Sequence, residues 1–310
     1  MEDKRIIDFI SNRMNILRTD LIEKDIILTK ILNKLSAEKE FLNNYAFKGG
    51  TCIIKCYLGY YRFSEDLDFT YISQDEFKDK SEGKIREEIS NKIDKVAKIL
   101  EVMSSSLGLR FKADKKNADY FTFGGGNAFV TMKLWYTAVD EKEAYIKVQI
   151  NYKEKLEFPI KEIEAKSVIS KEMEKDFVTN FKDEAKFLIR PIRIKAYDLK
   201  EILIEKVRAI LTRRGVKARD FIDIYEITNS EKLDITHFKQ GILEKTRAML
   251  RFDKYKDNLD KKKSIDLGKE IKNDRIKMEE ESIMLKSIHA NFDSFLDKFK
   301  IFVVELSKEV

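Results

Sequence analysis

Residues 48–72, KGGTCIIKCYLGYYRFSEDLDFTYI, contain the two motifs from which the fold can be inferred. The first motif is Lys-Gly-Gly-Thr, which predicts a turn at the start of a helix. Gly49 and Gly50 allow the backbone to come close to a ligand, and free N–H groups at a helix start suit phosphate oxygens. A Gly-Gly pair alone is usually only a turn, so its meaning depends on the neighbouring residues.

The second motif is SEDLDF at residues 64–69, which predicts a strand with two acids on one face. Asp66 and Asp68 are two residues apart, so in an extended chain both side chains point the same way. Magnesium favours one or two carboxylates together with waters and substrate phosphates. An Asp-x-Asp pair alone is usually a solvated strand face, but beside the glycine turn it predicts nucleotide chemistry. Three further polar residues accompany the two motifs: Lys48, Arg62 and Ser64.

Length and composition set the class of protein. The chain has 310 residues, of which 43% are hydrophobic, so it has one large or two ordinary domains with a sizeable core. The net charge of +6 mildly favours binding to polyanions. The chain has only two cysteines and two histidines, so a zinc site or a disulfide is improbable. The absence of a predicted disulfide fits a reducing cytoplasm. No apolar run is long enough to cross a membrane, and the first residues do not resemble a signal peptide.

Hydrophobic periodicity predicts a mixture of helices and strands. The predicted helices cover residues 3–16, 18–36, 51–58, 76–104, 196–213, 217–228, 235–250 and 284–306. The predicted strands cover residues 45–48, 66–72, 108–114, 119–123, 127–137 and 144–151, with a hairpin turn at 123–127. Residues 160–188 are polar and less regular, and we expect them to connect two domains and to contain a short helix.

A second group of polar residues lies in the predicted helices near residues 200 and 220. Lys206 lies among apolar neighbours, where a partly buried ammonium is costly unless it is paired. Asp220 lies near the first turn of the next helix, and Asp223 follows one turn later. Both acids have a purely structural interpretation, since the helix dipole favours an acid at a helix start. The functional interpretation is a Lys206 cation aimed at a triphosphate, with Asp220 or Asp223 orienting it or serving as a base.

Four motifs in order resemble the AbiEii/AbiGii toxin family, nucleotidyltransferase-like proteins of bacterial abortive-infection and toxin–antitoxin systems. The motifs are Lys48-Gly49-Gly50-Thr51, Arg62-x-Ser64-x-Asp66-Leu67-Asp68-Phe69, Glu205-Lys206-x-x-Ala209 and Arg219-Asp220-x-x-Asp223. The resemblance spans about residues 40–230. It implies an α+β fold: a polymerase-β-like nucleotidyltransferase core with a mixed sheet flanked by helices (residues 1–165), and a mainly helical C-terminal domain completing the active site (residues 186–310).

The resemblance also implies a cytoplasmic, phage-defence toxin that moves a nucleotide from a nucleoside triphosphate to RNA, most often the 3′ end of tRNA, under the control of a cognate antitoxin. Its implied catalytic residues are Asp66, Asp68, Lys206 and Asp220, and the two acids of the first motif pair would hold Mg²⁺. Its implied nucleotide-binding residues are Lys48, Gly49, Gly50, Thr51, Arg62, Ser64 and Lys206. Its implied supporting residues are Glu205, Arg219 and Asp223.

The sequence departs from the wider superfamily in two respects. The spacing from Gly50 to Asp66 is somewhat longer than in the simplest superfamily pattern, and one position of the core differs. That superfamily often supplies a third carboxylate from a later central strand, but the corresponding residues 147–151 read KVQIN and contain no acid. The third ligand is therefore either missing or supplied elsewhere, for instance by Asp220 or Asp223.

Three interpretations of the function remain open. In the first interpretation the acceptor is RNA, and the basic run Lys261-Lys262-Lys263 contacts its phosphates. The alternative interpretation of that run is a solvated loop. The acceptor is instead a protein side chain or a small molecule. In the third interpretation the chain binds nucleotide without transferring it, although the intact pair Asp66 and Asp68 argues against this.

Overall fold

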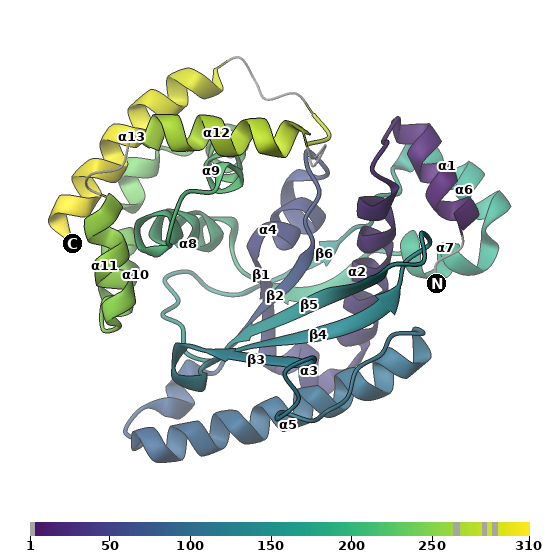
Figure 1. The fold of residues 1–310 in the computed structure, drawn as a ribbon, viewed down its shortest axis with the longest axis horizontal. Helices are drawn as coiled ribbons and strands as arrows, with labels where there is room; N and C mark the ends of the chain where they lie inside the picture. Colours follow the sequence, from purple (N-terminus) through teal and green to yellow (C-terminus); the bar gives the residue numbers. More distant parts are fainter. Residues whose placement is uncertain (1–3, 263–266, 281–283, 287–290) are drawn as a thin grey trace. The chain divides into compact units, whose positions relative to one another are not determined.

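The protein is seen here in a computed structural model that describes residues 4–262, 267–280, 284–286 and 291–310 (Figure 1). The chain divides into two compact units. The first unit comprises Met1–Glu154 and Ile160–Tyr197, and the second comprises Lys155–Pro159 and Asp198–Val310. No described helix has the length and apolar character needed to cross a membrane.

The first unit is built on a seven-stranded mixed sheet with the strand order β3-β4-β5-β2-β1-β7-β6. The strands are β1 (Tyr45–Lys48), β2 (Asp66–Tyr71), β3 (Phe121–Gly124), β4 (Phe129–Thr137), β5 (Glu143–Asn151), β6 (Lys161–Ala165) and β7 (Ile192–Ala196). β2 is antiparallel to β1 and parallel to β5. The central position of β2 therefore places its residues between the glycine turn and the β4–β5 hairpin.

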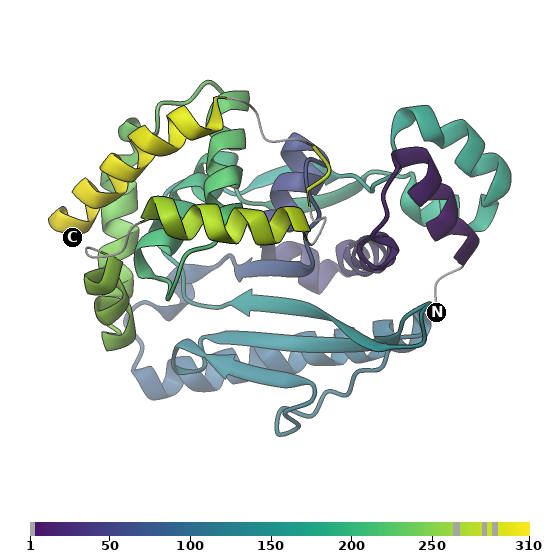
Figure 2. The ribbon, with the colours of Figure 1, turned by 45° about the horizontal axis from the view of Figure 1, so that its top comes forward.

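Helices accompany the sheet throughout the first unit. The α-helices are α1 (Lys4–Met14), α2 (Thr19–Ala37), α3 (Lys39–Asn44), α4 (Gly49–Cys52), α5 (Glu82–Ser106), α6 (Lys171–Asn180) and α7 (Lys182–Leu188). The shorter helical turns are the π-helix η1 (Ile53–Leu58) and the 3-10 helices η2 (Gln74–Phe77) and η3 (Gly125–Asn127). α2 contacts β2, β5 and β7, and α5 contacts β4, along which it lies in Figure 2.

One face of the sheet is apolar and the other is polar, because the side chains of each strand alternate. In β2, Leu67 and Phe69 are fully buried, whereas Asp66 and Asp68 are only half-buried. β4 and β5 repeat this alternation in register, with most even-numbered residues buried and most odd-numbered residues half-buried or exposed. The ring of Phe41 in α3 packs edge-on against Phe69, with centroids 4.9 Å apart, on the apolar face. The acids therefore lie on the opposite, polar face.

The second unit consists of helices among its described residues. They are α8 (Leu199–Thr212), α9 (Ala218–Ser230), the 3-10 helix η4 (Ile235–Phe238), α10 (Lys239–Met249), α11 (Asp253–Lys262), α12 (Leu267–Glu280) and α13 (Phe292–Glu309). α8 contacts α9, α10, α11 and α13. Phe221 of α9 and Phe299 of α13 pack edge to face with centroids 5.7 Å apart, so aromatic side chains fill part of this core.

The predicted α+β class, with a mixed sheet and flanking helices, is confirmed. The turn between β3 and β4 is also confirmed. The strand predicted over 108–114 is wrong, since only Arg110 forms an isolated bridge there, to Trp135. The single helix predicted over 76–104 is divided into η2 and α5, because Lys78 has extended dihedral angles.

Two other segments also differ from the prediction. Residues 160–188, expected to be a connection with one short helix, contain two helices, α6 and α7, and the strand β6. Their alternation is hard to detect because β6 exposes most of its side chains. The helix predicted over 284–306 begins instead at Phe292, and part of the predicted range, residues 287–290, lies outside the described residues.

Candidate active site

The glycine turn directly follows β1 and lies beside the acids of β2. The antiparallel register pairs Lys48 with Asp68. Gly49 has a φ of +77°, a region that other residues rarely adopt. An ideal Cβ on Gly49 would lie 2.5 Å from Oδ2 of Asp68, far inside van der Waals contact. Glycine therefore lets the backbone of the turn approach one of the two acids closely.

Gly50 also allows a close approach to the backbone of the turn, but by other side chains than at Gly49. A Cβ there would lie 2.6 Å from Nη2 of Arg62 and 3.2 Å from Oγ of Ser64. Arg62 is buried, and its Nη1 donates to the carbonyl oxygen of Phe63 at 2.7 Å. The guanidinium and the Ser64 hydroxyl therefore lie against the backbone of the turn.

Thr51 connects the turn to β2. Its Oγ1 lies 2.8 Å from Oγ of Ser64 and 2.5 Å from the carbonyl oxygen of Asp66. Thr51 itself is buried. These contacts give Thr51 a supporting position, behind the surface on which Gly49 and Gly50 were predicted to bind a triphosphate.

The acid pair fits a hard divalent cation. Asp66 and Asp68 present their carboxylates on the polar face of β2, and both remain half-buried rather than enclosed. This leaves room for waters and for substrate phosphate oxygens, the remaining ligands that Mg²⁺ prefers. The neighbouring strand contributes cationic and amide groups, since the register sets Lys147 beside Asp66 and Gln149 beside Asp68.

A third acidic ligand is not found beside this pair in the described part of the chain. The charged group next to Asp66 is a lysine and not a third carboxylate, since Nζ of Lys147 lies 3.5 Å from Oδ1 of Asp66. Among the described residues, no group of three or more His, Cys, Asp and Glu side chains could hold a metal. The site in the first unit is therefore a two-carboxylate site with a lysine next to it.

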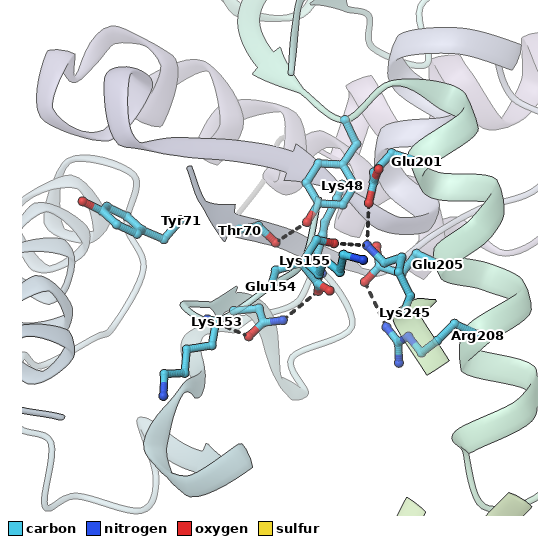
Figure 3. Close-up of polar contacts among 12 residues, drawn as sticks. Lys48, Thr70, Tyr71, Lys153, Glu154, Lys155, Glu201, Glu205, Arg208 and Lys245 are labelled. Carbon is cyan, nitrogen blue, oxygen red and sulfur yellow. Dashed lines mark hydrogen bonds and ion pairs between the residues drawn. The ribbon is translucent and has the colours of Figure 1, made fainter. Parts of the chain in front are cut away.

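Lys48 has a partner that the sequence did not indicate. Its Nζ lies 3.4 Å from Oε2 of Glu154 (Figure 3). The same Nζ lies 5.4 Å from the centre of the Tyr197 ring. Glu154 also accepts a hydrogen bond from Asn151, at 2.8 Å. The Glu154 side chain is only 7% exposed, so it is a buried counter-charge for Lys48. The only signal for Glu154 was its place just after a buried strand, which many surface acids share.

A buried ion pair lies behind the turn, and sequence reasoning missed it entirely. Nζ of Lys55, in η1, contacts Oδ1 of Asp25 at 2.8 Å, Oγ1 of Thr29 at 2.9 Å and the hydroxyl of Tyr60 at 2.6 Å. Tyr60 in turn donates to Oδ2 of Asp25 at 2.9 Å. Burial and the nearby Asp25 raise the pKa of Tyr60, so its hydroxyl keeps its proton. The network fastens η1, which continues the turn helix, to α2.

In the second unit, Lys206 is paired with both predicted acids. Its Nζ lies 2.7 Å from Oδ1 of Asp220 and 2.6 Å from Oδ2 of Asp223. Asp220 also pairs with Arg213. The two acids are 3% and 0% exposed, and Lys206 is 13% exposed, so the cluster is nearly buried. Although burial acts to raise it, the pKa of the Asp220 carboxyl is lowered because Lys206 and Arg213 stabilise the charged form.

The lowered pKa of Asp220 predicts a pH-dependent contribution to stability. A carboxyl whose pKa is lower in the folded state stabilises the protein above its unfolded-state pKa, and that contribution is lost as the pH falls through the folded-state value. Asp220→Asn should therefore lower the free energy of unfolding by about 1–3 kcal/mol at pH 7. The difference from the unchanged protein should shrink below about pH 4. Urea unfolding at pH 7, 5, 4 and 3 would measure it.

The control is Asp234→Asn, which changes an exposed acid that caps η4 in the same unit. Its effect should be smaller, because Asp234 has no buried cationic partner among the described residues. An Asp220→Asn deficit that stays constant from pH 7 to pH 3 would contradict the assignment of a lowered pKa.

The remaining predicted residues of the second unit have supporting or exposed positions. Glu205 accepts from Nη2 of Arg208 at 3.2 Å along α8 (Figure 3). Arg219 is exposed in the first turn of α9, whereas Asp220 points inward. Glu201, also on α8, forms a buried ion pair with Lys245 and accepts backbone hydrogen bonds from residues 157 and 158 at 2.9 and 2.8 Å.

For the basic run 261–263, the interpretation as a solvated loop is wrong where the structure describes it, and the contact with RNA phosphates stays a prediction. Lys261 and Lys262 belong to α11, and Lys262 is 2% exposed. Its Nζ donates to the carbonyl oxygen of Gly215. Burial, together with the nearby Arg213, lowers the pKa of Lys262. Lys263 lies outside the described residues.

The structure groups the predicted residues by unit. The first unit brings together Lys48, Gly49, Gly50, Thr51, Arg62, Ser64, Asp66 and Asp68. The second unit brings together Lys206, Asp220 and Asp223.

Two solved structures are similar to this chain at low sequence identity. MenT4, a nucleotidyltransferase toxin from Mycobacterium tuberculosis H37Rv, is 18% identical with a TM-score of 0.46, over 77% of this chain and 68% of that chain. An antigenic nucleotidyltransferase-like protein from Paracoccidioides brasiliensis is 14% identical with a TM-score of 0.31, over 67% of this chain and 76% of that chain. No curated protein gave a significant match.

The family comparison is decisive. A family model described as the nucleotidyl transferase AbiEii toxin of type IV toxin–antitoxin systems matches residues 30–305. The match extends well beyond the residues on which the resemblance rested, and it confirms that resemblance. The chain therefore belongs to the AbiEii family of nucleotidyltransferase toxins of type IV toxin–antitoxin systems.

Proposed function

We propose that this nucleotidyltransferase transfers a nucleoside monophosphate from a nucleoside triphosphate to the 3′ end of tRNA in the cytoplasm, and that the transfer depends on Mg²⁺. The observation that carries the proposal is the pairing of the Gly49 turn with the acids of β2 in one strand register. A type IV toxin acts with an antitoxin partner. We propose that this antitoxin restrains the transfer, which would otherwise block aminoacylation and stop translation.

The residues of the turn are the proposed triphosphate site. Asp68 lies close against the backbone at Gly49, and Arg62 and Ser64 lie close against it at Gly50. A cation and a hydroxyl group are what the oxygens of a leaving pyrophosphate need. Lys48 is already neutralised by Glu154, so its proposed part is to position the end of β1 rather than to supply free charge.

Asp66 and Asp68 are the proposed magnesium ligands, and the bound ion would neutralise charge on the phosphates. In the transfer, the acceptor hydroxyl oxygen forms a bond to the α-phosphorus. The bond from that phosphorus to the bridging oxygen breaks, and pyrophosphate leaves. We propose that the carboxylate of Asp66, the acid that contacts Lys147 of β5, accepts the hydroxyl proton. The parts assigned to Lys206 and Asp220 in the reaction stay predictions that rest on the family motifs.

The test uses the purified full chain, Mg²⁺ and total bacterial tRNA. Each of the four labelled nucleoside triphosphates is supplied separately, and Asp66→Ala/Asp68→Ala is the control. We expect label in tRNA with at least one triphosphate, no label with the control, and no label after chelation of the metal until Mg²⁺ is restored.

Other outcomes redirect the proposal. Label that appears on protein or on a small molecule, but never on tRNA, would replace the acceptor. Nucleotide binding without any transfer would support a non-catalytic module and contradict the proposal.

Gly49→Ala should lower the rate of transfer on the order of 100-fold, because the added Cβ would displace Asp68 and small displacements at a reacting centre are costly. The matched control is Gly59→Ala. Gly59 has a similar φ of +72°, but a Cβ there meets nothing within 4 Å. Both variants share the backbone strain of about 1–3 kcal/mol, which thermal unfolding would report. Equal transfer rates for the two variants would contradict the proposed contact between the turn and the acid.

A further inference from the structure

Two aromatic side chains stand on the polar face of the sheet, beside the acid pair. Trp135 of β4 and Tyr145 of β5 are opposite each other in the antiparallel register, and their ring centroids are 4.8 Å apart. Tyr145 is 36% exposed, and Trp135 is half-buried. The buried alternate positions of β4 and β5 already supply the core, so these two rings are not needed there.

The indole of Trp135 is held in a defined orientation. Its Nε1 donates to the carbonyl oxygen of Asp119 at 2.9 Å. The backbone of Trp135 also pairs with Arg110 in an isolated bridge. The pair of Trp135 and Tyr145 therefore forms a fixed aromatic surface rather than two loose side chains.

Two lysines lie beside this aromatic surface, and one of them also contacts an acid of the pair. Nζ of Lys133 lies 5.7 Å and Nζ of Lys147 lies 5.9 Å from the centre of the Tyr145 ring. Lys147 also contacts Asp66, at 3.5 Å. The four residues, which we call the aromatic strip, are Lys133, Trp135, Tyr145 and Lys147. Aromatic rings interleaved with cations are the composition that binds single-stranded nucleic acid, through base stacking and phosphate contacts.

The position of the aromatic strip fits the acceptor rather than the triphosphate. The strand order places β2 between β1, which ends in the glycine turn, and β5, which carries part of the strip. In phosphoryl transfer the attacking and leaving oxygens lie roughly in line, on opposite sides of the phosphorus. With pyrophosphate leaving toward the turn, the acceptor hydroxyl comes from the side of β5. Tyr145 is two residues before Lys147, a distance of about 7 Å along the strand.

We infer that the aromatic strip binds the unpaired nucleotides at the 3′ end of the RNA acceptor, with Trp135 and Tyr145 stacking on bases and Lys133 contacting a phosphate. This inference rests on the proposed transfer to RNA and adds to it the surface that receives the acceptor. The alternative source of a stacking base is the nucleoside triphosphate itself, and the experiment separates the two.

The chain carries its own reporter for the test, because Trp135 is the only tryptophan. Its fluorescence is measured while an unlabelled single-stranded RNA octamer is added to the full chain, without triphosphate or divalent metal. We expect saturable quenching. Tyr145→Ala should weaken binding roughly tenfold or more, as removal of one stacking ring does, and Tyr145→Phe should restore most of it. The matched control is Phe187→Ala, which removes an exposed ring of α7.

Salt dependence tests the lysine. The logarithm of the RNA affinity should fall linearly with the logarithm of salt concentration, and Lys133→Ala should reduce that slope by about 0.7, the value for one phosphate contact on a single strand. Lys98→Ala, which changes an exposed lysine of α5, should leave the slope unchanged.

The outcomes separate this inference from the proposed function. The inference would be overturned if nucleoside triphosphate quenches the fluorescence and the RNA octamer does not. It would also be overturned if Tyr145→Ala and Phe187→Ala bind RNA with equal affinity. Either result would count even if tRNA is labelled in the transfer assay. The Asp66→Ala/Asp68→Ala variant cannot carry out the transfer but should still show quenching by RNA. RNA quenching that is retained in this variant supports the aromatic strip independently of catalysis.

Discussion

Asp66→Asn and Asp68→Asn should each reduce the rate of nucleotide transfer on the order of 1,000-fold or more. Asparagine has nearly the same shape as aspartate but carries no charge, so it is a much poorer magnesium ligand. Both side chains are half-buried on the polar face of β2, while the neighbouring Leu67 and Phe69 hold the strand in the core. The substitutions should therefore leave the fold intact. The rate at which label is transferred to tRNA would measure the loss of activity. The growth of bacteria that express each variant would measure the loss of toxicity.

The control for this pair is Asp140→Asn. Asp140 is an exposed acid in the turn between β4 and β5, where it pairs with Lys142. Its substitution should leave both transfer and toxicity close to those of the unchanged protein. If Asp66→Asn arrests growth as strongly as the unchanged protein, toxicity does not depend on transfer, and binding alone would account for it.

Lys55→Met should lower the free energy of unfolding of the first unit by about 3–5 kcal/mol, the cost of leaving a buried charge without its partner. The Lys55 side chain is 0% exposed and that of Asp25 is 3% exposed, so water cannot replace the lost ammonium. Trp135 lies in the same unit, so its fluorescence during urea unfolding follows the unit that the substitution affects.

Two further variants test the cause of this loss. Lys24→Met changes the lysine that precedes Asp25 in the sequence. Its ion pair with Glu65 is partly exposed, so the substitution should lower the free energy of unfolding by less than about 1 kcal/mol. Adding Asp25→Asn to Lys55→Met removes the unpaired charge and keeps an acceptor for Tyr60, so it should restore at least half of the lost stability. A double variant no more stable than Lys55→Met would show that packing, not charge, sets the cost.

The parts of the site that depend on neighbouring residues could be predicted from the sequence. The two-residue period of β2 determines which side chains share a face, and the apolar residues between the acids point to the core. The closeness of the glycine turn and the two acids along the chain predicts that they form one site. These local rules placed the turn beside Asp66 and Asp68, and they also located β4 and β5.

The parts that depend on distant residues could not be predicted. Lys48 and Glu154 are separated by 106 residues, and Lys55 and Asp25 by 30. In a chain with 37% charged residues, a lysine has many possible partners, and only the folded sheet selects one. The strand predicted over 108–114 failed for a related reason. Alternation there was real, since Leu109 and Phe111 are buried, but the segment pairs with β4 only at Arg110.

The β1–β2 register has a consequence for how relatives of this protein are found. Because Lys48 faces Asp68 across two paired strands, the distance between the turn and the acids is set by hydrogen bonding and not by the length of the loop that joins them. Residues 53–58 are already wound as a π-helix, the form in which a helix accommodates an extra residue. Evolution can therefore lengthen or shorten this loop without moving the chemistry. A sequence search that requires a fixed number of residues between the glycines and the acids would overlook proteins that share the same site.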